Sequence, residues 1–167
     1  VQEDQANYPQ AEALLKSSLS IIEKQTGSEH PERAEAINAL AHAYLRDERF
    51  ADAEPLLKKA LELSENALGL DNVVTANGAR DLGTLYMKQK QYAEAQSYLQ
   101  KALTIDEKLY GDKAPQIAAD LISLATAYGL QSQSDKAAPL LKRAAEIKNV
   151  LAGGNAVPDE TPTLTTN

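Results

Sequence analysis

Apolar residues recur along this chain with the spacing of amphipathic helices. The residues Ile37, Leu40, Ala41 and Tyr44 follow the i, i+3, i+4, i+7 pattern that places side chains on one face of a helix. A second apolar stripe begins near Phe50, after a short polar turn, and consists of Ala53, Leu56, Leu57, Ala60, Leu61 and Leu68. The pattern therefore predicts two helices joined by a tight turn.

The same pattern returns every 42 residues. Four sets of residues keep this interval: Gly27, Gly69 and Gly111; Tyr44, Tyr86 and Tyr128; Leu15, Leu57, Leu99 and Leu141; Ala11, Ala53, Ala95 and Ala137. Aligning residues 29–70 with 71–112 gives eleven identities, nearly all at apolar or small positions. A repeat of this length is typical of a solenoid, in which each hairpin of helices buries its apolar face against its neighbours.

The repeat predicts an all-α chain of seven helices and no strand. We expect the helices at residues 8–26, 31–46, 50–68, 72–89, 92–109, 114–130 and 134–151. Pro31 and Pro115 suit the first turn of a helix, where a missing N–H costs no hydrogen bond. Gly27, Gly69 and Gly111 follow the last apolar position of a helix, where a left-handed cap favours glycine, so we expect positive φ at all three.

Small residues recur where the two helices of each hairpin are expected to cross. Two helices approach to roughly 8–10 Å only if the side chains at their contact are small. The crossing positions are Ala41, Gly83 and Ala125 on the first helices and Ala53, Ala95 and Ala137 on the second. The tyrosines of the repeat are expected to fill the space beside each crossing.

Composition supports the helical prediction and excludes several classes of function. The apolar residues are mostly Ala and Leu, strong helix formers, while aromatic residues are only 5%. The net charge of -7, without a basic run, argues against nucleic acid or an anionic membrane surface as a partner. No apolar run approaches the ~18 residues of a membrane span. The absence of Cys excludes thiolate chemistry and leaves the compartment open among cytoplasmic, periplasmic and secreted.

These residues resemble the tetratricopeptide repeat family. The pattern Leu, small residue, Tyr, and then Ala nine residues after the Tyr is the family's pattern, and the 42-residue unit resembles kinesin-light-chain repeats in particular. Residues 27–31 look like that group's inter-repeat loop, and residues 50–57 and 92–95 look like its second-helix opening. Such repeats usually carry paired Asn residues in the first helix. Only Asn38 is present here, with Arg80 and Ile122 at the equivalent positions, so we do not expect a cargo-peptide specificity like that of kinesin light chains.

The resemblance implies a right-handed superhelical solenoid of antiparallel helix pairs with about three and a half repeats. The expected units are a partial repeat at 1–28 (its second helix only), repeats at 29–70, 71–112 and 113–152, and a tail or linker at 153–167. The helix at residues 8–26 lacks a partner in this register. We expect a further helix upstream, and a cleaved signal sequence at that place is the alternative.

No constellation for catalysis is recognisable, so we expect no enzyme, no cofactor and no metal site. His30 fits a loop or capping role, and His42 is interpreted as either a ligand contact or a solvated side chain. Acidic pairs such as Asp106-Glu107 and Asp159-Glu160 are expected to be solvated. The two histidines lie on different elements and do not form a metal pair.

The candidate function is protein binding in the concave groove that the first helices line in this family. The resemblance places there Asn38, His42, Arg46, Asn77, Arg80, Thr84, Lys88, Ile122, Thr126 and Leu130, together with Glu35, Leu45, Met87 and Ala119. Three basic residues in this set predict a positive strip that attracts an acidic-plus-hydrophobic motif. Two alternatives stay open: this face is an ordinary solvated surface, or the chain is a structural segment that self-associates through exposed ends, the truncated N-terminal helix included.

Overall fold

The computed structural model describes residues 8–26 and 30–153, and within these ranges it contains seven α-helices and no strand. Their bounds are α1 Tyr8–Thr26, α2 Pro31–Arg46, α3 Phe50–Leu68, α4 Val73–Lys88, α5 Tyr92–Tyr110, α6 Pro115–Gly129 and α7 Ser134–Leu151. Each boundary lies within one residue of the predicted one. The all-α prediction is confirmed.

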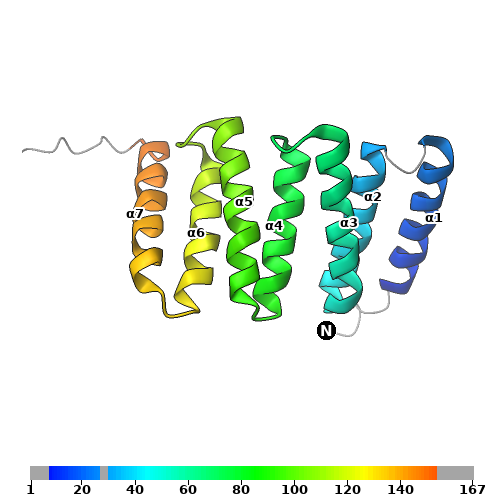
Figure 1. Cartoon of the computed structure of the whole chain (residues 1–167), viewed down its shortest axis with the longest axis horizontal. Helices are drawn as coiled ribbons and strands as arrows, with labels where there is room; N and C mark the ends of the chain where they lie inside the picture. Colours follow the sequence, from blue (N-terminus) through cyan, green and yellow to red (C-terminus); the bar gives the residue numbers. More distant parts are fainter. Residues whose placement is uncertain (1–7, 27–29, 154–167) are drawn as a thin grey trace, which may run out of the picture.

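The helices stand side by side in a row that follows their order along the chain (Figure 1). Consecutive helices run in opposite directions, and the extensive contacts join neighbours: α1 with α2, α2 with α3, and so on to α6 with α7. A smaller contact joins α2 with α4 across the hairpin between them. This is the arrangement of stacked hairpins that the 42-residue period predicts.

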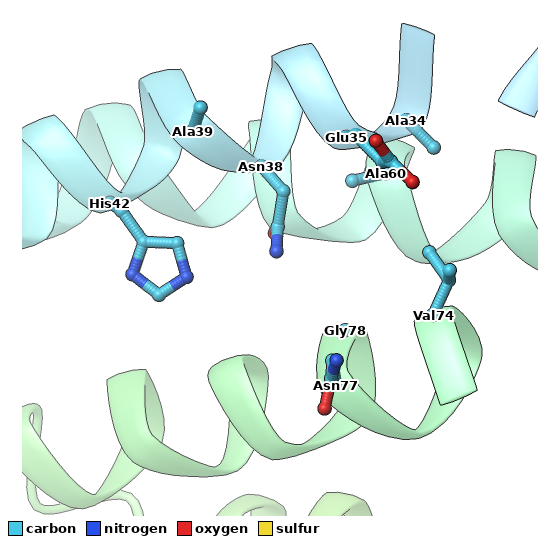
Figure 2. A pocket seen from close by; sticks show the side chains of 9 residues that line it. All are labelled: Ala34, Glu35, Asn38, Ala39, His42, Ala60, Val74, Asn77 and Gly78. Carbon is cyan, nitrogen blue, oxygen red and sulfur yellow. The ribbon is translucent and has the colours of Figure 1, made fainter. Parts of the chain in front are cut away.

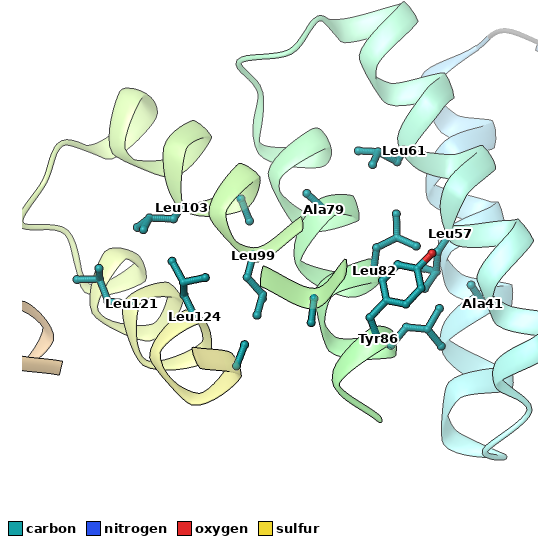
Figure 3. Close-up of a cluster of buried hydrophobic side chains, with 14 of the residues drawn as sticks. Ala41, Leu57, Leu61, Ala79, Leu82, Tyr86, Leu99, Leu103, Leu121 and Leu124 are labelled. Carbon is teal, nitrogen blue, oxygen red and sulfur yellow. The ribbon is translucent and has the colours of Figure 1, made fainter. Parts of the chain in front are cut away.

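A continuous apolar core runs through the row of helices (Figure 3). The crossing residues Ala41, Ala53 and Ala95 are completely buried, as predicted. Gly83 shows how close the crossing of α4 and α5 is, because a Cβ atom there would lie 2.6 Å from Leu99 Cγ. Only a hydrogen atom fits at this position, which explains a glycine in the middle of a helix.

The turn inside each hairpin repeats in atomic detail. Glu48, Lys90 and Ser132, spaced 42 residues apart, have φ of 55°, 61° and 58°. In each turn the next residue donates its backbone N–H to the carbonyl of the hairpin tyrosine, and the three N···O distances are 2.9, 2.9 and 3.0 Å. This is a Schellman cap with a non-glycine residue at its left-handed position. The sequence gives no hint of it, since none of the three residues is Gly or Asn.

The glycines after α3 and α5 have the predicted positive φ. Gly69 lies at φ 87°, ψ 175° and Gly111 at φ 77°, ψ 164°, while Gly27 lies outside the described residues. Because ψ is close to 180°, these are not left-handed helical caps of the expected kind. They occupy a region that is essentially restricted to glycine.

Replacing Gly69 with Val is expected to lower the free energy of unfolding by about 1–3 kcal/mol. A Cβ at Gly69 would have no atom within 4 Å, so the loss comes from the backbone alone. Gly129 is the matched control, since it also has open space around its Cβ position and lacks a positive φ. Urea unfolding of both variants measures the difference, and an equal effect of Gly69→Val and Gly129→Val would contradict the backbone argument.

Candidate functional site

Two pockets lie between successive first helices, α2, α4 and α6. The α2–α4 pocket has a volume of about 350 Å³ and is lined by Ala34, Glu35, Asn38, Ala39, His42, Ala60, Val74, Asn77 and Gly78. The α4–α6 pocket, of about 280 Å³, is lined by Val73, Asn77, Arg80, Asp106, Tyr110, Gln116, Ala119 and Asp120. Adding 42 to positions 35, 38, 74, 77 and 78 of the first pocket gives positions of the second. The two pockets are therefore one site repeated along the solenoid.

Polar side chains from α2 converge on the α2–α4 pocket (Figure 2). Asn38 Nδ2 donates a hydrogen bond of 2.8 Å to Asp81 Oδ2, and His42 Nε2 lies 3.0 Å from the same oxygen. Hydrogen bonding to the Asp81 carboxylate raises the pKa of His42 above its usual 6.5, although partial burial opposes this. His42 is 49% exposed, so it is both solvated and partnered.

The α4–α6 pocket holds an ion cluster that joins three helices. Arg80 Nε donates to Asp120 Oδ1 at 2.8 Å, Nη2 donates to Asp106 Oδ2, and Nη1 donates to Asn77 Oδ1 at 2.6 Å. Asp106 and Asp120 are only 1% and 2% exposed. Burial, with a further contribution from the neighbouring Asp120 carboxyl, raises the pKa of Asp106 to about 6, against the opposing effect of Arg80.

This cluster corrects the expectation that Asp106 is solvated and the expectation that the charge of Arg80 is available to a ligand. The prediction that Asp106 is a solvated surface residue is wrong, because its side chain is buried against Arg80 and Asp120. Its neighbour Glu107 is half-buried and pairs with Arg143 at 2.5 Å. The pair Asp159-Glu160 lies outside the described residues. Arg80 does line the groove, but its charge is already matched by two carboxylates.

The other expected groove residues differ in what they offer a ligand. Arg46 and Lys88 are exposed at the C-terminal ends of α2 and α4, and in the described part of the chain their side chains form no hydrogen bond or ion pair. The hydroxyls of Thr84 and Thr126 donate to carbonyls of their own helices at 3.0 and 2.8 Å. Ile122 is half-buried against the core, and Leu130 is 53% exposed.

Asp81 and Asp120 are the groove residues that the sequence interpretation missed. A signal for Asp120 exists, since the equivalent positions in the two preceding repeats hold Ala36 and Gly78. A carboxylate at a position that is otherwise small implies a buried charge with a partner. The same signal marks Asp81, whose equivalents Ala39 and Ser123 are also small.

The remaining expectations concern helix capping by His30, metal binding and membrane-spanning helices. His30 caps α2 by accepting a hydrogen bond of 3.4 Å at Nδ1 from the backbone N–H of Glu32, and its equivalent Asn72 caps α4 at 2.7 Å. Within residues 8–26 and 30–153, no group of three or more His, Cys, Asp or Glu side chains could hold a metal ion. The described helices include none that is long and apolar enough to cross a membrane.

The row of hairpins and its repeated inter-helix pockets define a helical repeat protein of the solenoid class. A family model described as tetratricopeptide repeat matches residues 1–66 and 74–149. The chain therefore belongs to the tetratricopeptide repeat family. Comparison with curated proteins gave no significant match.

Solved structures place the repeats with the kinesin-light-chain type. BtubC (BKLC) from P. vanneervenii aligns with a TM-score of 0.82 and 24% identity over 97% of this chain and 65% of that one. A putative kinesin light chain with nearly identical TPR-like repeats from Podosopora anserina gives 0.77 and 25% over 88% and 70%. MamA shares the fold at 0.59 and 21% over 91% and 84%. The chain thus spans less than two thirds of the length of BtubC.

Proposed function

We propose that this chain binds a segment of a partner protein in the groove formed by α2, α4 and α6. Tetratricopeptide repeat proteins generally serve as protein-interaction scaffolds and typically have no enzymatic activity. The observation that carries the proposal is the repeated pocket, because two equivalent open sites one repeat apart suit an extended chain that crosses successive first helices.

The groove offers two kinds of contact to such a segment. Arg46 and Lys88 are the cations available to acidic residues, while Ile122 and Leu130 in the last repeat offer apolar surface. Exposed charge pairs contribute only ~0.2–1 kcal/mol each, so an apolar anchor supplies much of the affinity. The proposed ligand is a linear motif with acidic and apolar parts, bound weakly and with salt sensitivity.

Reversing the charge of Lys88 together with Arg46 is expected to weaken partner binding several-fold at low salt and to flatten its salt dependence. The reason is that two exposed cations, neither of which forms an ion pair with the described residues, become anions, and exposed pairs are screened by salt. Ile122→Asp should weaken binding at every salt concentration. Fluorescence anisotropy with a peptide selected by display against the whole chain measures both effects.

The matched control is Lys148→Glu, the same change at an exposed position of α7 away from the first helices. A selected peptide whose affinity ignored Arg46, Lys88 and Ile122 would show that it docks elsewhere. Arg80→Glu, although it lies in the groove, does not test ligand charge, because it would place a third carboxylate beside Asp106 and Asp120.

The second candidate function is self-association of a structural segment. It is favoured by the exposure of Leu14 and Ile21 on α1, which are 72% and 52% exposed. Leu15, by contrast, packs against the core. A concentration-dependent dimer that disappears when Leu14 and Ile21 become polar, with peptide binding absent, would favour this candidate over the groove.

A further inference from the structure

We propose that a fall in pH from 8 to 5.5 strengthens the binding of the acidic partner segment, because side chains at the centre of the groove take up protons. The inference rests on the proposed function and adds regulation to it. The responding groups are His42, which lies between α2 and α4, and Asp106, which lines the α4–α6 pocket. Both are distinct from Arg46 and Lys88, the exposed cations offered to the acidic residues.

The centre of the groove holds more carboxylates than cations. Asp106 and Asp120 both contact the guanidinium of Arg80, and both approach the same nitrogen, Nη2. Burial alone would lower the pKa of Arg80, but its hydrogen bond to Asp120 raises this pKa above the ordinary value. The charges of Asp106 and of Asp81, the next residue on α4, act in the same direction. One guanidinium therefore faces three carboxylates, which leaves an excess of negative charge when all three are ionised.

This excess of negative charge opposes an acidic ligand. Arg46 lies four residues after His42 on α2, and Lys88 lies seven residues after Asp81 on α4, which is roughly 10 Å along the helix. Repulsion between like charges still acts over such a distance at physiological salt, and it is screened less where the charges are partly buried. An acidic segment held by Arg46 and Lys88 is therefore repelled by the ionised carboxylates.

His42 is the first group that takes up a proton. Its Nε2 lies 3.0 Å from Asp81 Oδ2 (Figure 2 shows the imidazole facing α4). The charged groups around this imidazole are Asp81 on α4 and, on its own helix, Arg46 and Glu35. The hydrogen bond to Asp81 raises the pKa of His42 above 6.5, against the effects of burial and of Arg46. Protonated His42 neutralises Asp81, and it does so at the surface of the groove, because the imidazole is 49% exposed.

Asp106 is the second group that takes up a proton. Its Oδ2 accepts a hydrogen bond from Arg80, whereas its Oδ1 is buried and has no donor among the described residues. The charged groups that face it are Arg80 from α4 and Asp120 from α6. Burial raises the pKa of Asp106 to about 6, and the Asp120 carboxyl adds to this effect. A proton bound by this pair of carboxyls removes one negative charge from the groove.

Neither titratable group is required by the repeat itself. The residues equivalent to His42 in the next two repeats are Thr84 and Thr126, which carry no charge. The residue equivalent to Asp106 in the preceding repeat is Ser64, which is 1% exposed and donates its hydroxyl to a carbonyl of its own helix. A neutral side chain therefore satisfies the packing at both positions, and the titratable groups add a dependence on pH.

Both protonations act in the same direction on an acidic ligand. At pH 8 Asp106 is ionised and the negative charges of the groove are in excess. At pH 5.5 His42 is mostly protonated and Asp106 is protonated in more than half of the molecules, so the groove gains positive charge. The aspartate and glutamate residues of a ligand stay ionised at pH 5.5, because their ordinary pKa values are about 4. The attraction to the groove therefore increases while the charge of the ligand is unchanged.

The experiment measures the affinity of two capped pentapeptides, Glu-Glu-Ala-Leu-Leu and Gln-Gln-Ala-Leu-Leu, for the whole chain by amide NMR at pH 5.5 and pH 8. The glutamate peptide is expected to bind about fivefold more tightly at pH 5.5, and the glutamine peptide equally at both. His42→Gln should reduce this dependence on pH, and His42→Gln with Asp106→Asn should remove it. The matched control is His30→Asn, which keeps a helix cap like that of Asn72 and should leave the dependence intact. If Asp106→Asn does not fold, His42→Gln alone still tests the half-exposed group.

A second readout does not depend on comparing affinities. The chain has two histidines, so the imidazole resonances of His42 and His30 can be followed separately in a pH titration. Because coupling between two binding events is reciprocal, saturation with the glutamate peptide should raise the pKa of His42 and leave that of His30 unchanged. A merely structural role of His42 would not produce this change.

Equal affinity of the glutamate peptide at the two pH values, with shifts on the first helices, would overturn the regulation and leave the groove function standing. The same pH dependence for both peptides would also overturn it, because the charge of the ligand would then play no part. The absence of any shift on α2, α4 and α6 with either peptide at either pH would count against the groove function and its regulation together.

Discussion

Replacing Arg80 with methionine is expected to lower the free energy of unfolding by roughly 3 kcal/mol at neutral pH, since breaking a buried ion pair leaves a charge without compensation. Arg80 is the cation that contacts Asp106 on α5 and Asp120 on α6, and both carboxylates are almost completely buried. Methionine keeps the stem but removes every donor. Lys88→Met, on the same helix at an exposed position without an ion pair, should change stability by a few tenths of a kcal/mol at most.

The loss in Arg80→Met should shrink as the pH falls. In the folded protein the pKa of Asp106 is about 6, above its ordinary value of 3.8, so protonation of this carboxyl favours the folded state. That stabilisation is fully present below about pH 4 and is lost as pH rises through 6. Urea unfolding at pH 5 and pH 7.5 measures the change, and Asp106→Asn should reduce it. Equal losses in Arg80→Met and Lys88→Met would show that the cluster contributes nothing.

Replacing Ala95 with leucine is expected to destabilise the protein by roughly 1–3 kcal/mol, because extra methylene groups at a closely packed crossing force neighbouring side chains to move. Ala95 is completely buried on α5, close to the position where Gly83 and Leu99 meet. Ala93→Leu makes the same change two residues away at an exposed position and should be nearly neutral. Thermal unfolding of the two variants tests the register directly.

Lys101→Leu would be a poor control for that experiment. Its ammonium group pairs with Glu65 on α3, and its side chain is only 37% exposed. A loss of stability on replacing Lys101 would therefore mix an ion-pair effect with a packing effect. Ala93 and Ala95 avoid this problem because they differ mainly in burial.

The fold could be predicted because the same pattern of apolar and small residues recurs in each repeat. The spacing of Leu40, Tyr44 and Leu57 is a local signal for two helices, and its return at 42-residue intervals makes chance agreement improbable. The ends of helices can also be predicted from the sequence where a residue has a specific backbone role, as Pro31 and Gly69 do. The positive φ at Glu48 and its equivalents could not be predicted, because the surrounding helices impose a conformation that these side chains do not favour.

The candidate site could be predicted only in part, because its chemistry depends on pairs that are distant in sequence. First-helix positions such as Asn38 and Lys88 follow from the register. The partners of Arg80 lie 26 and 40 residues away, and a basic residue in a sequence does not show that its charge is already used. The partners of Asp81 are also distant in sequence, because its carboxylate contacts Asn38 and His42 of the preceding repeat.

The concentration of helix contacts on chain neighbours has a consequence for how the protein folds. Every extensive contact joins helices that follow one another, so the loops that must close on folding are short. Low contact order favours rapid folding, and the described helices, whose extensive contacts are with chain neighbours, approximate a one-dimensional array of coupled units. The Arg80 cluster raises that coupling at one junction by joining α4, α5 and α6. Folding can therefore begin at that junction and spread outward one hairpin at a time.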